Sequence, residues 1–188
     1  RIGSTNRNIA GDKMKQRIAK FIASSGVASR RDAEKLVLSG VVSVNNIKLN
    51  SVATIIDDET DVITVNGKKI QPQSNTELYI FNKPLNIMTT ARDPRGCKTI
   101  YDILPDEVKN LKPVGRLDKD STGLLILTND GDLINSLTHP SVKVAKNYRV
   151  VAQGRMKMPQ LEEMARGIEI EKGQIAYAES SIIEYDGK

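Results

Sequence analysis

Residues that build metal and redox sites are scarce in this sequence. Its 188 residues include one Cys, one His and no Trp. A single Cys excludes a disulfide within the chain and a metal site made of several thiolates, and a single His excludes a histidine cluster. We therefore expect no protein-bound metal.

Long apolar runs are missing as well. No stretch approaches the roughly 20 apolar residues that cross a bilayer, and the polar residues 1–13 lack the apolar core of a secretory signal. We expect a soluble, cytoplasmic protein that binds no membrane. Residues 1–13 are expected to be a disordered or tag-like stretch, with Met14 as a natural start.

Acidic residues are sparse in the first part of the chain. Residues 1–50 contain ten Lys or Arg against three Asp or Glu, a net charge of +7, whereas residues 51–188 contain 18 against 20, a net charge of −2. A basic front end before a nearly neutral remainder indicates that the first part binds a polyanion. A charge imbalance that serves only solubility is the alternative interpretation.

A first module is predicted over residues 14–70. Ile18, Phe21 and Ile22 are spaced to share one face of a helix, and Gly26 ends that helix.

Local signals then predict a second helix and two β-hairpins. Ser29-Arg30-Arg31-Asp32 has the form of a capping box, and Gly40 supplies the stop of the helix that begins there. Asn45-Asn46 and Asn66-Gly67 each stand between short apolar segments and predict tight hairpin turns.

Basic side chains gather on the two predicted helices. A helix N-terminus also attracts anions, so the set predicts a compact surface for phosphates. Any one of these side chains could simply face solvent on the surface of a helix, but that interpretation explains the whole set less well. The residues are Lys15, Arg17 and Lys20 from the first helix, and Arg30, Arg31 and Lys35 from the second.

A polar linker at residues 71–76 precedes a second module at residues 77–188. The second module opens with a predicted strand at Leu78–Phe81. Its later part predicts a helix at Met158–Ala165, a stop at Gly167 and strands at Ile168–Ile170 and Ala176–Glu184. The whole chain is predicted to be α+β: a small module of helices and hairpins, then a mixed, mainly antiparallel sheet with flanking helices.

One polar loop of the second module carries two carboxylates among cations. Residues 116–122 lead into Leu124–Leu127, an apolar run that predicts a buried central strand. Asp118 and Asp120 fit the roles of nucleophile, general acid–base pair or metal ligands. Spacing alone favours an ordinary charged surface loop, and metal binding lacks a third acid nearby.

The first module resembles an S4 RNA-binding domain, through Arg17–Lys35 followed by Gly40–Asn45. The family usually has Asn-Gly where this chain has Asn45-Asn46, a mild departure because Asn also enters the left-handed region. The resemblance implies binding to structured RNA.

The second module resembles the RsuA/RluB type of ribosomal RNA pseudouridine synthase, and an S4 domain ahead of it is that family's architecture. The central motif runs from Gly115-Arg116-Leu117-Asp118 to Asp130-Gly131. The flanking motifs, in the family's order, are Asn82-Lys83-Pro84, Thr89–Gly96, Thr99–Asp102, Leu137–Pro140 and Lys146–Val150. The resemblance covers residues 17–187.

This resemblance implies isomerisation of a specific uridine to pseudouridine in ribosomal RNA, with Asp118 as the catalytic carboxylate. Family members flip the uracil out of its helix, stack it on a Tyr that corresponds to Tyr148, and use that Tyr in deprotonating C5. Arg116 is expected to contact the flipped nucleotide or its phosphate. Lys146 is expected to do the same, and the equally weighted alternative is that its side chain faces solvent without contacting the nucleotide.

No cofactor is expected, because the isomerisation needs no redox step and no electron sink. The expected partner is ribosomal RNA or a ribosome assembly intermediate, bound by a monomer. Lys83 is expected to have an architectural role, and His139 to be a structural hydrogen-bonding residue.

The end of the chain departs from the family. Family members continue with a basic motif whose Arg pairs with the catalytic Asp, whereas this sequence stops at Lys188. We expect a C-terminal truncation with little or no activity, because Asp118 without that Arg would have a higher pKa and a poor orientation.

Three alternatives stay open. The first is an S4-type RNA-binding protein whose second domain is not catalytic. The second is an Asp-dependent glycosidase or nucleosidase, which needs a second carboxyl such as Asp120. The third is small-subunit rRNA as the substrate, although the sequences of Gly26–Arg31 and Asp93–Gly96 are closer to family members that modify large-subunit rRNA.

Overall fold

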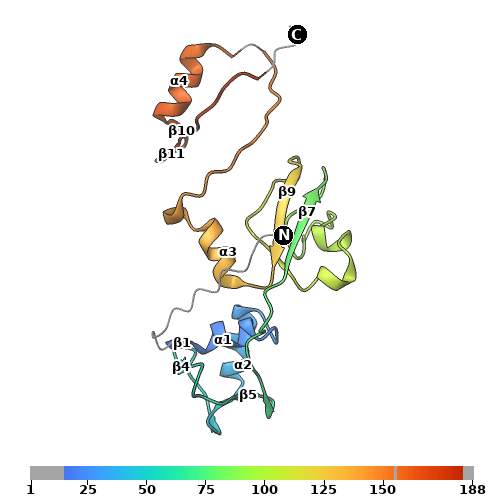
Figure 1. Cartoon of the computed structure of the whole chain (residues 1–188), viewed down its shortest axis with the longest axis vertical. Helices are drawn as coiled ribbons and strands as arrows, with labels where there is room; N and C mark the ends of the chain where they lie inside the picture. The colour runs from blue at the N-terminus through green and yellow to red at the C-terminus, as the bar shows by residue number, and fades with distance from the viewer. Residues whose placement is uncertain (1–14, 155, 184–188) are drawn as a thin grey trace. The chain divides into compact units, whose positions relative to one another are not determined.

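The computed structural model describes residues 15–154 and 156–183, so the predicted N-terminal stretch at residues 1–13 lies outside the described residues. The chain forms two compact units with a boundary between Val144 and Ala145. The first unit therefore contains the first module and the beginning of the second module, and the second unit contains the rest of the second module. Helices, short strands and antiparallel sheets make up both units (Figure 1), which confirms the α+β class. Within the described residues, every helix is too short or too polar to span a bilayer.

The first module combines two helices with antiparallel strands. Its four-stranded sheet has the order β3-β2-β5-β6, and β1 pairs separately with β4. The elements are β1 (Lys15–Arg17), α1 (Ile18–Ser24), α2 (Arg30–Leu38), β2 (Val42–Val44), β3 (Ile47–Lys48), β4 (Ile55–Asp57), β5 (Ile63–Val65) and β6 (Lys68–Lys69).

The helix α2 begins where the capping box predicted it. The hydroxyl of Ser29 accepts a hydrogen bond from the backbone N–H of Asp32 at 3.2 Å and donates one to the Asp32 carboxylate at 2.7 Å. Gly40 follows the helix with φ +71°, a left-handed conformation that costs Gly little. Both predicted ends of the second helix are therefore confirmed.

Both predicted hairpin turns are confirmed as well. Asn45 and Asn46 have φ of 50° and 68° between β2 and β3, while Asn66 and Gly67 have φ of 50° and 74° between β5 and β6. Two successive residues with positive φ match the right-handed twist of the flanking strands. Asn45-Asn46 thus forms the turn for which Asn-Gly is the commoner solution.

The start of the first helix was predicted wrongly. Lys15 and Arg17 lie on the strand β1, and only Lys20 of that group lies on α1. The backbone of β1 pairs in antiparallel register with β4, Lys15 opposite Asp57 and Arg17 opposite Ile55. This long-range pairing fixes an extended conformation, so the helix begins at Ile18.

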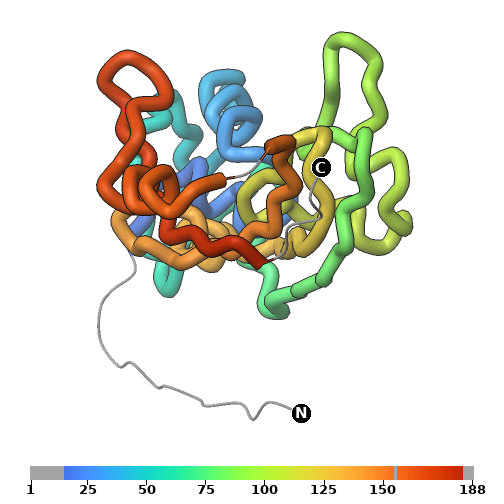
Figure 2. Tube along the Cα trace, turned by 90° about the horizontal axis from the view of Figure 1, so that it is seen from above, coloured from blue at the N-terminus to red at the C-terminus, as the bar shows by residue number. Residues whose placement is uncertain are grey.

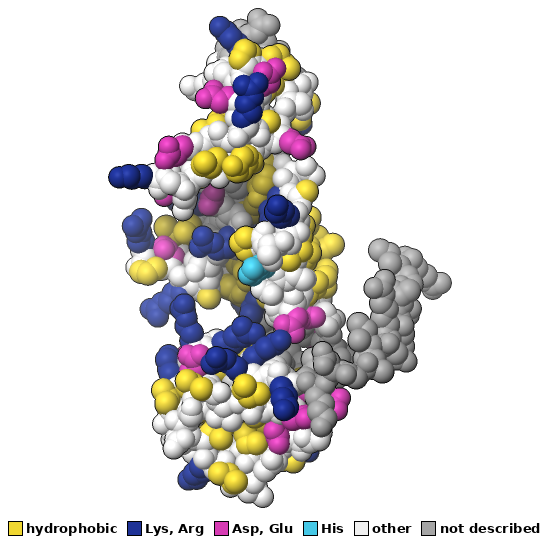
Figure 3. Space-filling model, turned by 90° about the vertical axis from the view of Figure 1, so that its left-hand side faces the viewer, with side chains coloured by type: hydrophobic (Ala, Val, Ile, Leu, Met, Phe, Trp, Pro, Cys, Tyr) yellow, Lys and Arg dark blue, Asp and Glu magenta, His cyan; other side chains and the backbone are white. Residues whose placement is uncertain are grey.

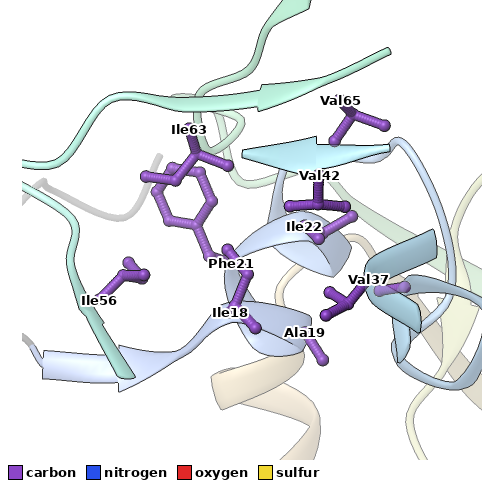
Figure 4. Close-up of a cluster of buried hydrophobic side chains, with 10 residues drawn as sticks. Ile18, Ala19, Phe21, Ile22, Val37, Val42, Ile56, Ile63 and Val65 are labelled. Carbon is purple, nitrogen blue, oxygen red and sulfur yellow. The ribbon is translucent and has the colours of Figure 1, made fainter. Parts of the chain in front are cut away.

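The core of the first module lies between its helices and its sheet. Figure 4 shows the Phe21 ring pointing toward Ile63 of β5, and Ile22 beside Val42 of β2. Each of these four side chains is at most 2% exposed. Complete burial of one such side chain stabilises the fold by about 1.5–3 kcal/mol.

The second module is built on a three-stranded antiparallel sheet with β9 in the centre, between β7 and β8. Leu125 and Leu127 of β9 are buried, but Leu124 is 65% exposed. The predicted central position is confirmed, whereas burial applies to one face of the strand only. The elements are β7 (Leu78–Lys83), the 3-10 helices η1 (Ile100–Asp102) and η2 (Asp106–Val108), β8 (Lys112–Pro113), β9 (Gly123–Thr128), α3 (Gly131–Thr138) and the 3-10 helix η3 (Pro140–Val142).

A long excursion, residues 84–111, joins β7 to β8; in Figure 2 it is the green to yellow-green chain. Four of its apolar residues are buried together with two of β9, Leu125 and Leu127: Ile87, Ile100, Leu104 and Leu111. The excursion therefore supplies the core that covers one face of the sheet.

Residues 90–97 form a loop within this excursion. Among the residues that the structure describes, their hydrogen bonds stay inside the loop: Thr90 to Arg92, Gly96 to Asp93, and Cys97 to Asp93. The backbone N–H of Cys97 lowers the pKa of Asp93 below its ordinary value. The loop is held by its own contacts.

The second unit contains α4 (Met158–Arg166), β10 (Ile168–Glu171) and β11 (Gln174–Ala176). The predicted helix and its stop are confirmed: Gly167 has φ +110°, and a Cβ there would lie 2.7 Å from Ile175. The strand predicted at Ala176–Glu184 is wrong for the described residues. The antiparallel pairing with β10 ends at Ala176, and residues 177–183 have no regular secondary structure.

Candidate functional site

The candidate site is the loop of residues 114–122, which joins β8 to β9 and exposes Asp118. At its start, Val114 donates a backbone hydrogen bond to Ile126 at 2.7 Å. Near its end, Ser121 donates to the carbonyl of Asp118 at 3.1 Å. The loop is thus tied to the central strand and closes a turn beside Asp118.

The residue before Asp118 is held by a side chain. The Thr89 hydroxyl donates a hydrogen bond to the carbonyl oxygen of Leu117 at 2.7 Å and accepts one from the N–H of the same residue at 3.2 Å. Thr89 is only 8% exposed. A single buried hydroxyl therefore satisfies both backbone groups of Leu117.

The residue after Asp118 is held by the backbone. Asn86 donates its N–H to the carbonyl oxygen of Lys119 at 2.9 Å. Residues 86–89 thus contact the loop on both sides of Asp118, which fixes the course of its backbone while its side chain stays exposed. Preorganised geometry of this kind is what catalytic groups need.

Lys83 is a buried cation beside this loop. It has no exposed surface, and its Nζ donates to the carbonyl oxygens of Pro84 at 3.0 Å and Ile87 at 2.7 Å. Burial lowers the pKa of Lys83, and the negative charges of Asp120 and Asp118 oppose that shift. Its expected architectural role is confirmed by the two carbonyl contacts.

The pairing of β7 with β9 explains how Lys83 comes close to the loop. Lys83 ends β7 and lies opposite Gly123, the first residue of β9, which directly follows the loop. Gly123 has φ +122°, a conformation that L side chains rarely adopt. A side chain is therefore disfavoured at the point where the loop enters the strand.

The other residues predicted for the site are divided between the two units. Arg116 is exposed on the same loop as Asp118. Lys146 and Tyr148 belong to the second unit, in a stretch without regular secondary structure, and Tyr148 is 63% exposed. The structure brings Arg116 and Asp118 together, and it describes Tyr148 and Lys146 as part of the other unit.

The predicted phosphate-binding residues differ in their surroundings. Lys20 pairs with Asp132 of α3 at 2.7 Å, and Lys35 pairs with Asp32 of its own helix at 2.7 Å. The hydrogen bonds from Lys35 and Ser29 lower the pKa of Asp32 below its ordinary value.

Arg30 and Arg31 stand in the first turn of α2 with exposed side chains. Figure 3 shows Lys and Arg side chains gathered over one face of the first module. Five cations of the predicted set are exposed, and Lys35 among them is already paired with Asp32: Lys15, Arg17, Arg30, Arg31 and Lys35.

His139 has the structural role expected of it. It caps η3, where its Nδ1 lies 2.7 Å from the Ser141 hydroxyl and accepts a hydrogen bond from the Ser141 N–H at 3.3 Å. In the described part of the chain, no three His, Cys, Asp or Glu side chains converge as metal ligands would.

The sequence did not predict the contact of Thr89 with the loop of Asp118. Thr89 belongs to a quoted motif, yet its partner Leu117 lies 28 residues further along the chain. No spacing rule connects the two, and a Thr beside another Thr is an ordinary surface pattern. The only feature of the sequence that pointed to Thr89 was its position in the motif Thr89–Gly96.

Two family profiles match the chain. The profile described as RNA pseudouridylate synthase matches residues 77–184, and that of the S4 domain matches residues 16–63. The first match includes the loop of residues 114–122 together with Thr89 and Tyr148.

Individual relatives agree with these matches. An uncharacterized RNA pseudouridine synthase of Aquifex aeolicus is 42% identical over 176 residues, which cover 93% of this chain and 70% of the relative. The ribosomal large subunit pseudouridine synthase B of Bacillus subtilis is 35% identical over 173 residues, covering 92% and 70%.

A solved structure shares the fold. The crystal structure of a pseudouridylate synthase superposes with a TM-score of 0.55 at 24% identity, covering 89% of this chain and 73% of the other.

Proposed function

Because the chain belongs to the RNA pseudouridylate synthase family, we propose that it converts a uridine of large-subunit ribosomal RNA to pseudouridine with Asp118 as the catalytic carboxylate. One observation carries the choice of residue: the Asp118 side chain is exposed, while its two neighbours, Leu117 and Lys119, are hydrogen-bonded to residues 86–89. The relative from Bacillus subtilis, named for the large subunit, supports the choice of RNA.

The reaction sets what the site must do. The bond from C1′ of the ribose to N1 of uracil breaks, and a bond from C1′ to C5 forms. C5 loses its proton and N1 gains one, so the product is an isomer of the substrate. An ionised carboxylate assists by adding covalently to the sugar or the base, or by promoting formation of a glycal.

Asp118 is the carboxylate best placed for this work. It lies in a loop that is fixed at both neighbouring residues and that enters the central strand of the sheet. Asp120 shares the loop and its exposure, but only one of its two neighbours, Lys119, is hydrogen-bonded to residues 86–89. Asp120 is therefore the matched control for any test of Asp118.

Two further residues are assigned roles toward the nucleotide. A uracil flipped out of its helix loses its stacking partners, and the exposed ring of Tyr148 offers a replacement and a group that deprotonates C5. Arg116, two residues before Asp118, carries a charge suited to the phosphate of the flipped nucleotide. Lys146 supplies a second cation near Tyr148 in the sequence.

The first module is assigned to RNA docking. Arg30 and Arg31 combine their charges with the N-terminal end of α2, where unpaired N–H groups favour phosphate. Lys15, Arg17, Lys20 and Lys35 extend this basic surface. We assign the protein to the cytoplasm, acting as a monomer on ribosomal RNA or on a ribosome assembly intermediate.

The test compares Asp118→Asn with Asp120→Asn, both made in the full-length protein. Large-subunit rRNA labelled with tritium at C5 of uridine releases tritium each time pseudouridine forms, so release measures turnover. Asp118→Asn should lower the rate by about 10²–10⁴-fold, the range for loss of a positioned catalytic group, whereas Asp120→Asn should retain most of it. RNA affinity, measured by gel shift, should change little in either variant.

Each result bears on a different part of the proposal. Turnover that survives in Asp118→Asn contradicts the catalytic assignment. Equal losses in both variants favour a pair of carboxylates, as in a glycosidase. Mapping pseudouridines in rRNA from cells that lack the protein tests the substrate, since a site missing from small-subunit rRNA alone contradicts the large-subunit assignment.

A further inference from the structure

Asp118 depends for its position on a hydroxyl from another part of the chain. The two hydrogen bonds between Thr89 and Leu117, at 2.7 and 3.2 Å, use both the donor and the acceptor capacity of the Thr89 side chain. Leu117 is only half-buried and directly precedes Asp118. The contact therefore acts one peptide away from the proposed catalytic carboxylate.

Thr89 is itself rigidly held. Its neighbour Met88 accepts a backbone hydrogen bond from Ile100 and donates one to Lys98, both at 2.9 Å. Ile100 is fully buried in the core of the second module. A chain of hydrogen bonds thus runs from the core, through Met88 and Thr89, to Leu117.

No comparable side chain holds the loop elsewhere among the described residues. Val114 at its start, Lys119 after Asp118 and Ser121 near its end are held by backbone bonds. Those bonds survive any substitution other than proline, whereas the bonds to Leu117 depend on the identity of one side chain. Thr89 is therefore the position at which a substitution can release the peptide before Asp118.

We propose that Thr89 is a positioning residue of the reaction: its hydroxyl fixes the Leu117 peptide and thereby the direction of the Asp118 carboxylate. The proposal rests on the proposed function of Asp118. Without the hydroxyl, the Leu117 peptide can rotate, and the carboxylate leaves the geometry in which it reaches the nucleotide. A displacement of about 1 Å can cost a hundredfold in rate.

Three variants at position 89, compared with the native Thr, separate the hydroxyl from the methyl group. Thr and Val share the methyl, while Ser and Ala lack it, and only Thr and Ser have the hydroxyl. We expect Thr89→Val and Thr89→Ala to lower kcat for tritium release by about 10–100-fold, with KM and RNA affinity within about threefold. Thr89→Ser should keep kcat within about threefold of the unaltered protein.

Thr128→Val is the matched control. Thr128 is fully buried, and its hydroxyl also bonds two backbone groups, donating to the carbonyl oxygen of Glu77 at 2.6 Å and accepting from the N–H of Asp130 at 3.1 Å, but it does not contact the loop. It should reduce thermal stability without a selective loss of kcat. If Thr89→Val does not fold, Thr89→Ser and Thr89→Ala still form a pair that differs only in the hydroxyl.

Three outcomes overturn the inference. The first is kcat within threefold in Thr89→Val and Thr89→Ala, the second is a loss in Thr89→Ser as large as in Thr89→Ala, and the third is the same loss of kcat in Thr128→Val. A double variant separates this failure from failure of the proposed function. If Thr89 acts through Asp118, Thr89→Val should not lower the residual rate of Asp118→Asn any further. If Asp118→Asn is fully active, the catalytic assignment fails whatever the result at Thr89.

Discussion

The ammonium of Lys83 lies 2.7 Å from the carbonyl oxygen of Ile87, and Lys83 has no exposed surface. Lys is among the residues least often buried completely. Here the charge is placed among carbonyl oxygens, and it holds the turn at residues 84–87 whose Asn86 supports the loop of Asp118. The burial of Lys83 and the shape of the candidate site are therefore connected.

Replacing Lys83 with Met should lower the free energy of unfolding by about 1–3 kcal/mol, the cost of leaving a buried carbonyl without its donor. Met retains much of the volume, so the loss reports the hydrogen bonds rather than a cavity. Urea denaturation at neutral pH measures it. Lys119→Met, at an exposed side chain, should stay within about 0.5 kcal/mol. A gain in stability for Lys83→Met would mean that desolvation of the ammonium outweighs its hydrogen bonds.

The stability of the first module should depend on pH through Asp61. The Asp57 N–H and the Asn45 side chain each donate to its carboxylate at 2.8 Å, and these bonds lower its pKa below the ordinary 3.8. A carboxyl whose pKa is lower in the folded state stabilises fully above its unfolded pKa, and this contribution is lost as the pH falls through the folded pKa.

The difference in unfolding free energy between the unaltered protein and Asp61→Asn should therefore be greatest near neutral pH and shrink below about pH 4. Denaturant titrations at several pH values measure this difference. If it stays constant from neutral pH to pH 3, the hydrogen bonds to Asp61 do not favour its ionised form.

The cations of the first module should contribute unequally to RNA affinity. Arg31 is exposed in the first turn of α2, whereas Lys20 pairs with Asp132 at 2.7 Å and must leave that partner to bind phosphate. Arg31→Ala should reduce the slope of log affinity against log salt by about 0.7–0.9, the value for one phosphate contact. Lys20→Ala should change the slope by less. A larger effect at Lys20 would contradict this order.

Local signals predicted the parts of the fold that local physics determines. The cap at Ser29 and the hairpin turns at Asn45-Asn46 and Asn66-Gly67 need only residues close in sequence. The central position of β9 followed from its apolar run, and the position of Asp118 on an exposed loop followed from its polar surroundings.

Contacts between distant residues could not be predicted in this way. Lys15 and Arg17 are extended because β1 pairs with β4, about forty residues later. The contact of Thr89 with Leu117 spans 28 residues, and the ion pair of Lys20 with Asp132 spans 112. A one-dimensional pattern holds no information about which distant polar groups meet.

The self-contained loop at residues 90–97 has an evolutionary consequence. The contacts that hold Asp118 come from residues 86–89, which are anchored by residues 98–100, so they lie just before and just after this loop. The loop can therefore change in length and charge between related enzymes without disturbing the peptides around Asp118. A change within residues 90–97 and a change at Asp118 are therefore structurally independent of one another.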